Sequence, residues 1–361
     1  MKILYISPEN TVGILGLWKK AHIKKGNKCK FITLYKTKQN YEEDICLNLP
    51  LIKANFLYTS LRHYYYIIFR GVKGDYKEKE GLPPKWQPNS FIEKLFFKLR
   101  DWIWSFKVEK AIKKWNLLDY DIFHLEWGLE FYRYGHFVKR LNELNKPIIC
   151  TYHGQDLRTR GVINHIDIYS KLNLTSELDL LPKHPDLNYL FLPYDTDKHN
   201  PLLKVKKKIR IVHSPTNRYY KGSDTIIPIC QKIANRSDVE FILLENMDSN
   251  RVEAIKQSCD ILIDQVHNRG GWGYGMNSIE AMSMGLCCVT ELVPEYLEFI
   301  KDHPFVNVTG DNLYEKLLML VNNHELIMHH KRLSREWVVK YHSINQVSDR
   351  LYNYYTEKNI I

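Results

Sequence analysis

Apolar runs rich in β-branched residues alternate with amphipathic stretches along most of this chain, and the alternation occurs in two successive series. Short apolar strands that alternate with helices are typical of a parallel sheet covered by helices on both faces. The first series predicts strands over residues 3–7, 30–35, 121–125, 147–151 and 189–193, with helices over 17–25 and 137–144. The second predicts strands over 209–213, 239–244, 260–264 and 286–290, with helices over 224–234, 250–258 and 278–284. The sequence therefore predicts an α/β fold with two Rossmann-like, doubly wound domains.

The length of the chain agrees with two domains. Its 361 residues exceed one ordinary α/β core and suit two domains of roughly 150–200 residues each. The polar stretch 195–208, in which four lysines follow Pro201, is the expected linker. We therefore expect a first domain over residues 1–197 and a second over residues 208–344.

Residues 55–116 interrupt the alternation and carry much of the positive charge. Residues 1–120 hold 23 Lys and Arg against 11 Asp and Glu, whereas the rest of the chain is nearly balanced. Within the interruption, residues 91–115 place aromatic and aliphatic side chains at helical spacing among lysines. Two interpretations are open: a helix that lies in an anionic membrane interface, or a helix that buries this apolar face in the domain core. Single-stranded nucleic acid would also suit a basic aromatic surface, but no RNA-binding motif accompanies it, so no nucleic-acid partner is expected.

Composition limits the class of protein further. No run approaches the roughly 18–20 apolar residues that span a bilayer, and no export signal is expected at the N-terminus. The seven cysteines are scattered without a CxxC pair, which predicts a reducing cytoplasm and no structural metal. The segment 324–330 resembles a zinc-protease motif, but Met328 stands where its second histidine is required.

The segment 259–282 has the order strand, glycine-rich loop, helix, and it carries the sharpest chemical signal. Glycines allow the backbone to approach a ligand closely, and the helix N-terminus beyond them presents N–H groups that suit phosphate. Asn277 or Ser278 is the expected N-cap of this helix. Glu280 lies about one turn further on, where its carboxylate can accept hydrogen bonds from ribose hydroxyls. A simple turn is the alternative interpretation.

Two further strand ends carry polar residues. Residues 211–224 place Arg218 and Lys221 in a loop before a helix, and two such cations suit a diphosphate, although a solvated loop is the alternative. Residues 149–158 place His153 and Asp156 at a strand end, where open α/β sheets bind ligands. There His153 is either a donor to a substrate oxygen or a structural residue, and Asp156 either orients it or caps the next turn.

Taken together, these segments resemble retaining glycosyltransferases of the two-Rossmann-domain (GT-B) type, close to glycosyltransferase family 4. The resemblance implies that the second domain binds a nucleotide-diphosphate sugar and the first domain binds the acceptor. It further implies that a helix over residues 345–355 crosses back onto the first domain. By this resemblance the catalytic residues are His153, Lys221 and Arg218. The donor-binding residues are Gly13, Gly16, Asn217, Gly273, Tyr274, Gly275, Met276, Asn277 and Glu280, and the acceptor or sugar side holds Glu126, Asp156 and Trp272.

Two departures from the family pattern matter. The family commonly has a second glutamate eight positions before the one matched by Glu280, and Trp272 stands there in this chain. Arg218 is only three positions before Lys221, closer than is usual in the family.

The resemblance implies metal-independent transfer of a hexosyl group with retention of configuration. The nucleotide sugar is then the donor substrate, and no cofactor is expected. A glycan or lipid-linked acceptor at the cytoplasmic membrane surface is the expected partner. A nucleotide-sugar epimerase or hydrolase on the same fold, or a noncatalytic sugar-nucleotide binder, remains open.

Overall fold

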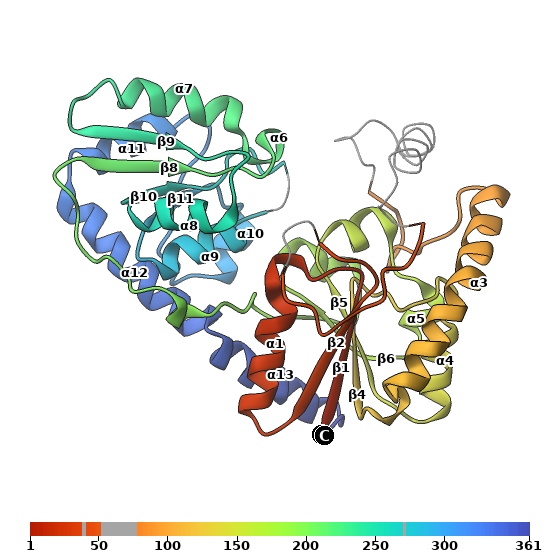
Figure 1. Ribbon diagram of the computed structural model, residues 1–361. Coiled ribbons are helices and arrows are strands. Elements are labelled where there is room, and N and C mark those ends of the chain that lie inside the picture. The colour runs from red at the N-terminus through yellow and green to blue at the C-terminus, as the bar shows by residue number, and fades with distance from the viewer. Residues whose placement is uncertain (38–40, 52–77, 270–271) are drawn as a thin grey trace. The chain divides into compact units, whose positions relative to one another are not determined.

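The computed structural model describes residues 1–37, 41–51, 78–269 and 272–361 (Figure 1). Contacts divide the chain into two compact units, Met1–Leu190 together with Ser348–Ile361, and Phe191–Val347. Each unit carries one parallel sheet, which confirms the predicted α/β class with two Rossmann-like domains. Most of the aromatic tract before residue 78, and Gly270 and Gly271 of the glycine-rich segment, lie outside the described residues.

The first unit is built on a seven-stranded sheet with the order β3-β2-β1-β4-β5-β6-β7. All of its pairings are parallel. The strands are β1 (Lys2–Ser7), β2 (Lys28–Thr33), β3 (Ile45–Cys46), β4 (Ile122–Glu126), β5 (Ile148–Tyr152), β6 (Ser170–Thr175) and β7 (Leu187–Tyr189). The order reverses between β1 and β4, and open α/β sheets bind ligands at the carboxyl ends of strands beside such a reversal.

Helices and short turns cover both faces of this sheet. The helices are α1 (Ile14–Lys24), α3 (Phe91–Lys114), α4 (His136–Glu143) and α5 (Asn164–Asp167), and the shorter turns are η1 (Thr11–Gly13), η2 (Leu117–Asp119), η3 (Asp156–Arg160) and η4 (Leu178–Lys183). Because both faces are covered, strands such as β1 and β5 are buried almost throughout and form continuous apolar runs. The strand predicted over 189–193 is wrong in position, because β7 spans Leu187–Tyr189. The more polar β6 and the short β3 were not predicted.

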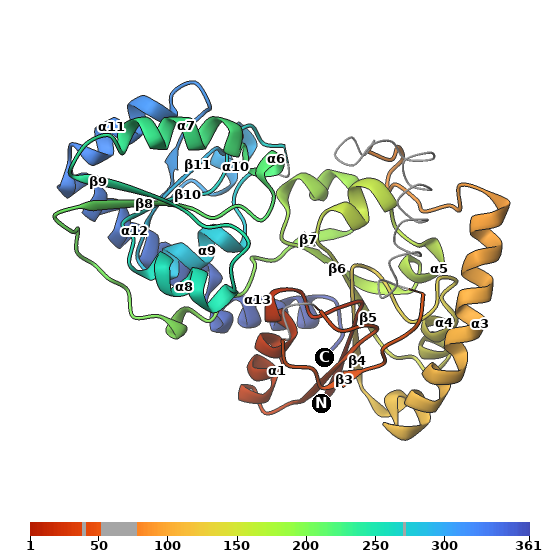
Figure 2. The same cartoon turned by 45° about the horizontal axis from the view of Figure 1, so that its top comes forward.

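The second unit holds a five-stranded parallel sheet with the order β12-β11-β10-β8-β9 (Figure 2). Its strands are β8 (Ile209–His213), β9 (Val239–Leu243), β10 (Ile261–Ile263), β11 (Cys287–Thr290) and β12 (Val306–Asn307). Its helices are α6 (Arg218–Lys221), α7 (Ser223–Ile233), α8 (Ser249–Gln257), α9 (Met276–Ser283), α10 (Pro294–Phe299), α11 (Leu313–Val321) and α12 (His324–His342), and the short turn η5 (Thr196–Lys198) precedes β8. Here the strand order reverses between β8 and β10.

The last helix, α13 (Ile344–Glu357), begins in the second unit and from Ser348 onward belongs to the first. The Tyr355 hydroxyl lies 2.5 Å from Nε2 of His124, and the Tyr352 hydroxyl lies 2.8 Å from Nδ1 of His22. Tyr354 donates a hydrogen bond to the carbonyl of Tyr189. These contacts fix the returning helix on the first unit, as the resemblance implied.

Helix α3 packs with a face other than the one that the sequence pattern emphasised. Ser90 caps the helix by accepting a hydrogen bond from the N–H of Glu93. The buried residues of α3 are Arg100, Asp101, Trp104, Val108, Ala111 and Ile112. Most of the aromatic and aliphatic series that begins at Phe91 is exposed, so the interpretation of that face as a core face is wrong. No helix in the described part of the chain is long and apolar enough to cross a bilayer.

Candidate functional site

A buried carboxylate organises the strand ends of the second unit at the reversal of strand order. Asp264 directly follows β10 and is fully buried. It accepts hydrogen bonds from Nζ of Lys221 at 2.6 Å, from Nδ2 of Asn277 at 2.8 Å and from Oγ of Ser278 at 2.7 Å. Burial alone would raise the pKa of this carboxyl, but Lys221 and the two neutral donors outweigh it and hold the pKa below its usual range. Asp264 is thus a fixed anion that joins three segments.

The chain after β8 places Lys221 by a short, tightly turned helix. Asn217 caps α6, because its side-chain oxygen accepts hydrogen bonds from the N–H groups of Tyr219 and Tyr220. Gly222 follows with φ of +64°, and a Cβ atom there would lie 2.6 Å from the carbonyl oxygen of Val266. Glycine is therefore required at this position. The turn directs Lys221 to the end of β10, while Asn217 acts as a helix cap.

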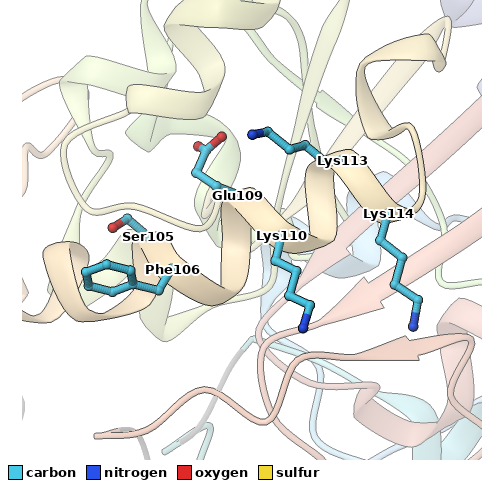
Figure 3. A pocket seen from close by; sticks show the side chains of 6 residues that line it. All are labelled: Ser105, Phe106, Glu109, Lys110, Lys113 and Lys114. Atoms are coloured by element: carbon cyan, nitrogen blue, oxygen red, sulfur yellow. The ribbon is translucent and has the colours of Figure 1, made fainter.

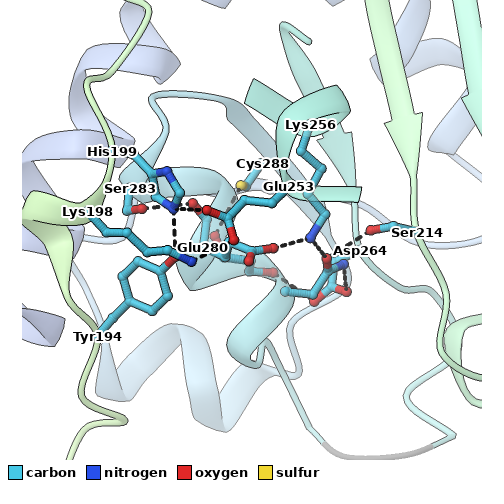
Figure 4. Close-up of polar contacts among 12 residues, drawn as sticks. Tyr194, Lys198, His199, Ser214, Glu253, Lys256, Asp264, Glu280, Ser283 and Cys288 are labelled. Carbon is cyan, nitrogen blue, oxygen red and sulfur yellow. Dashed lines mark hydrogen bonds and ion pairs between the residues drawn. The ribbon is translucent and has the colours of Figure 1, made fainter. Parts of the chain in front are cut away.

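Lys256 is a second cation of this site, and the sequence did not reveal it. Its side chain, from the end of α8, is almost fully buried. Nζ of Lys256 donates to Oδ1 of Asn277 at 2.6 Å and forms an ion pair with Glu280 (Figure 4). Asn277 also accepts a hydrogen bond from Oγ of Ser214, which directly follows β8. Asn277 thus joins the Asp264 cluster to the pair of Lys256 and Glu280.

The glycine-rich loop ends in a helix N-terminus, but the predicted cap is wrong. Helix α9 begins at Met276 with Gly275 as N-cap, and glycine has no side chain that could cap the helix. Asn277 and Ser278 instead direct their side chains to Asp264, which explains why neither serves as the cap. The first N–H groups of a helix have no partner within the helix. The backbone of this turn therefore has the geometry that receives an anion.

Residues 272–274, which precede Gly275, pack against other parts of the second unit. Tyr274 is buried in an aromatic cluster, and its hydroxyl lies 3.0 Å from Nε2 of His342. A Cβ atom on Gly273 would lie 2.8 Å from the ring of Tyr296. Trp272 is half-buried, and its carbonyl accepts a hydrogen bond from Val293. The side chain of Tyr274 is therefore engaged within the second unit, which leaves its backbone for a contact with a ligand.

A further polar cluster lies beside Glu280 and was also not predicted. Glu253 accepts from Nζ of Lys198 at 2.6 Å and lies 3.3 Å from Nε2 of His199 (Figure 4). The Tyr194 hydroxyl lies 3.0 Å from the same histidine nitrogen. Burial raises the pKa of Tyr194, and the negative charge of Glu280 adds to this effect. The segment expected to be only a linker thus supplies side chains next to the candidate site.

Arg218 does not share the partner of Lys221. Its guanidinium forms two hydrogen bonds with Glu245, at 2.7 and 2.5 Å, and 61% of its side chain is exposed. The Lys221 side chain is only 18% exposed. The sequence predicted that Arg218 and Lys221 act together on a diphosphate. In the structure the two cations have different partners, Glu245 for Arg218 and Asp264 for Lys221.

In the first unit, His153 pairs with Glu126 across two neighbouring strand ends. Nε2 of His153, just after β5, lies 2.5 Å from Oε2 of Glu126, the last residue of β4. Burial opposes protonation of the ring, but Glu126 outweighs it and holds the pKa of His153 above its usual range. Asp156 accepts hydrogen bonds from the backbone N–H groups of His153, Gly154 and Leu157. Two roles were predicted for Asp156, and the structure shows that it caps the turn. The residue that contacts the ring of His153 is Glu126.

A buried arginine supports the turn beneath His153. Arg158 forms two hydrogen bonds with Asp179, at 2.5 and 2.6 Å, and one with Glu177 at 3.1 Å. A Cβ atom on Gly154 would lie 2.7 Å from Nη1 of Arg158. Burial raises the pKa of Glu177 to about 7, against the opposing effect of Arg158. This part of the first unit therefore holds a carboxyl group that titrates near neutral pH.

The glycine loop after β1 also lies at the strand-order reversal of the first unit. Gly13 has φ of +74° and directly precedes α1. The side chain of Asn10 orders this loop by accepting from the N–H of Leu15 and donating to the carbonyl of Glu42. Gly16 lies within α1, where a Cβ atom would meet no atom of the described residues within 4 Å. The loop thus leaves room for a ligand beside Gly16.

The described part of the chain holds neither a metal-site arrangement nor a disulfide. No group of three or more His, Cys, Asp or Glu side chains there has the arrangement of a metal site. The seven cysteines are unpaired, and all except the half-buried Cys46 are buried.

No protein-family model and no curated protein sequence matches this chain. Solved structures do match it along nearly their full length. A sucrose-phosphate synthase from Thermosynechococcus elongatus is 13% identical over 99% of this chain and 98% of its own, with a TM-score of 0.60. TarM is 12% identical over 98% of both chains, with a TM-score of 0.58. Anabaena HepE, in complex with UDP and glucose, is 11% identical over 99% of both chains, with a TM-score of 0.57. The chain therefore has the GT-B fold.

Proposed function

We propose that this chain is a glycosyltransferase that moves a hexosyl group from a nucleoside diphosphate sugar to a hydroxyl acceptor. The observation that carries the proposal is the cluster of Lys221, Asp264 and Asn277 at the strand-order reversal of the second unit, beside the N-terminus of α9. The resemblance to glycosyltransferase family 4 assigns Lys221 to catalysis and Asn277 to the donor site, and the structure adds Asp264 to them. The similar folds include HepE in complex with UDP-glucose, so a uridine diphosphate sugar is the first donor to test.

The donor diphosphate is held by Lys221 and by the backbone N–H groups at the start of α9. Glu280 binds the ribose hydroxyls, and Lys256 fixes its carboxylate. Trp272 stands in place of the usual sugar-binding glutamate, so recognition of the sugar falls to other groups near the loop. Arg218 has a secondary role at most, because Glu245 already engages its guanidinium.

The proposed chemistry is electrostatic. Negative charge develops on the leaving diphosphate as the glycosidic bond breaks, and a fixed cation and aligned N–H dipoles stabilise that charge without a metal ion. From the resemblance to glycosyltransferase family 4 we propose transfer with retention, with the acceptor attacking from the side of the leaving group, and no side chain is therefore assigned as a nucleophile. His153, oriented by Glu126, contacts the transferred sugar in this proposal.

The acceptor is proposed to be a glycan or a lipid-linked glycan at the cytoplasmic side of a membrane. One TarM structure with a similar fold contains fondaparinux, α-GlcNAc-glycerol and UDP, which supports a sugar-bearing acceptor. The basic first third of the chain favours an anionic surface nearby.

The test begins with a thermal-shift screen of nucleotides and nucleotide sugars, because a bound ligand raises the melting temperature by mass action. The donor that stabilises the protein is then incubated with and without a panel of glycan and glycolipid acceptors, and release of the nucleotide is measured. We expect release that depends on an acceptor. Conversion of the donor alone at the same rate would point to an epimerase or hydrolase. Donor binding without turnover on any acceptor would point to a noncatalytic binder.

A further inference from the structure

Helix α3 has two apolar faces, and one of them is exposed. One face packs into the hydrophobic core of the first unit and includes Trp104, Val108 and Ile112. With 3.6 residues per turn, a second series falls on the opposite side of the helix. Each member of this series is more than half exposed: Phe91, Ile92, Leu95, Leu99, Trp102 and Phe106. A contiguous series of large exposed apolar side chains on a folded protein indicates an interaction surface.

The same exposed face becomes basic toward the end of the helix. Lys110, Lys113 and Lys114 line an open depression together with Ser105, Phe106 and Glu109 (Figure 3). All three lysines are exposed, and so are Lys94, Lys98 and Lys107 along the borders of the apolar series. Glu109 forms an ion pair with Arg140 of α4 at 2.8 Å, so the guanidinium of Arg140 already balances the negative charge of Glu109. The face therefore combines apolar side chains with an excess of positive charge.

We propose that this face of α3 docks the protein on an anionic lipid bilayer. An amphipathic helix binds an interface when its aromatic and aliphatic side chains enter the boundary between headgroups and acyl chains while lysines remain at the headgroups. Trp102 is of the residue type that prefers this boundary. The depression among Lys110, Lys113 and Lys114 receives the phosphate of a lipid headgroup.

Charge decides between a bilayer and a second copy of this chain. Pairing two copies through this face would gather the six exposed lysines of each helix at one interface, and like charges gathered at an interface oppose association. An anionic bilayer instead supplies the opposite charge, with each lysine near the surface contributing about fivefold in affinity. The inference extends the proposed acceptor class but does not depend on glycosyl transfer, because docking is measured without donor or acceptor.

The experiment is flotation of the full chain with vesicles of phosphatidylglycerol and phosphatidylcholine, compared with vesicles of phosphatidylcholine alone. We expect binding to the anionic vesicles at low salt and weaker binding at high salt, because salt screens the lysines. Leu99→Glu and Trp102→Glu are expected to weaken binding by at least about tenfold. Lys110→Ala with Lys114→Ala is expected to weaken it by about 25-fold. Ile168→Glu is the matched control, since Ile168 is 60% exposed on the same unit but outside α3.

Three results would overturn the proposal: no binding of the wild-type chain to anionic vesicles, unchanged binding of both Glu variants, or equal loss in Ile168→Glu. A dimer in solution that Trp102→Glu dissociates, together with no vesicle binding, would assign the face to a second copy. The melting temperature of each variant, compared with that of the wild type, tests whether the variant is folded. Nucleotide binding, measured separately without vesicles, tests the proposed function on its own.

Discussion

Replacing Lys221 by Met tests the proposed donor site at the point where the structure is most specific. Nζ of Lys221 is held 2.6 Å from Asp264 and 3.1 Å from Oε1 of Gln265, so the cation is already positioned before any ligand binds. A hydrogen bond to a charged group contributes about 1.5–3 kcal/mol. Loss of that contact to the diphosphate is therefore expected to raise the Kd for UDP by about 10–150-fold.

Arg218→Met is the matched comparison, because Arg218 lies on the same short helix and carries the same charge. Its side chain is largely exposed and already engaged by Glu245. We expect its Kd for UDP to change by less than about threefold, since exposed charges contribute little. Isothermal titration calorimetry with UDP measures both variants.

Stability has to be measured in parallel, because Lys221→Met also removes the countercharge of the buried Asp264. The carboxylate keeps its hydrogen bonds from Asn277 and Ser278, so the variant is expected to fold with a reduced free energy of unfolding. Urea unfolding shows whether the calorimetry is performed on folded protein. UDP affinity equal to that of the wild type in a folded Lys221→Met variant would refute the site, as would a larger loss in Arg218→Met.

Two further predictions concern stability. Lys331 and Asp260 form a fully buried ion pair at 3.1 Å. Lys331→Met is therefore expected to lower the free energy of unfolding, measured with urea, by about 3–5 kcal/mol. Lys340 belongs to an exposed ion pair, so Lys340→Met is expected to leave the urea midpoint unchanged. Equal midpoints for the two variants would contradict this. Burial lowers the pKa of His22 and of His342 to about 4, so between about pH 6.5 and pH 4 the unfolded chain binds protons that the folded chain does not. The contribution of each histidine to the free energy of unfolding should therefore fall by at most about 3 kcal/mol as pH decreases through this range, whereas the raised pKa of Glu177 acts in the opposite direction. A His342→Gln variant that loses as much free energy of unfolding as the wild type between about pH 7.5 and pH 5 would argue against the contribution of His342.

The sequence determined the features that depend on local pattern. Apolar runs and amphipathic periods predicted most strands and helices within about two residues, because each reflects the burial of one short segment. The strand at 209–213 coincides with β8. The glycine-rich loop and the helix beginning near Met276 were also predictable, since glycine and helix-starting signals act over a few neighbouring residues.

Tertiary structure decided which side chains meet. Lys256 looks like a solvated helix lysine in the sequence, yet folding brings it to Glu280, 24 positions away, and buries it. Glu126 likewise reaches the ring of His153 across 27 positions, because β4 and β5 lie side by side in the sheet. The physical reason is that a buried charge must find a partner, and only the packed arrangement of strands and helices selects that partner. The glycine loop was therefore foreseeable from the sequence, whereas the cation that holds Glu280 was decided by the fold.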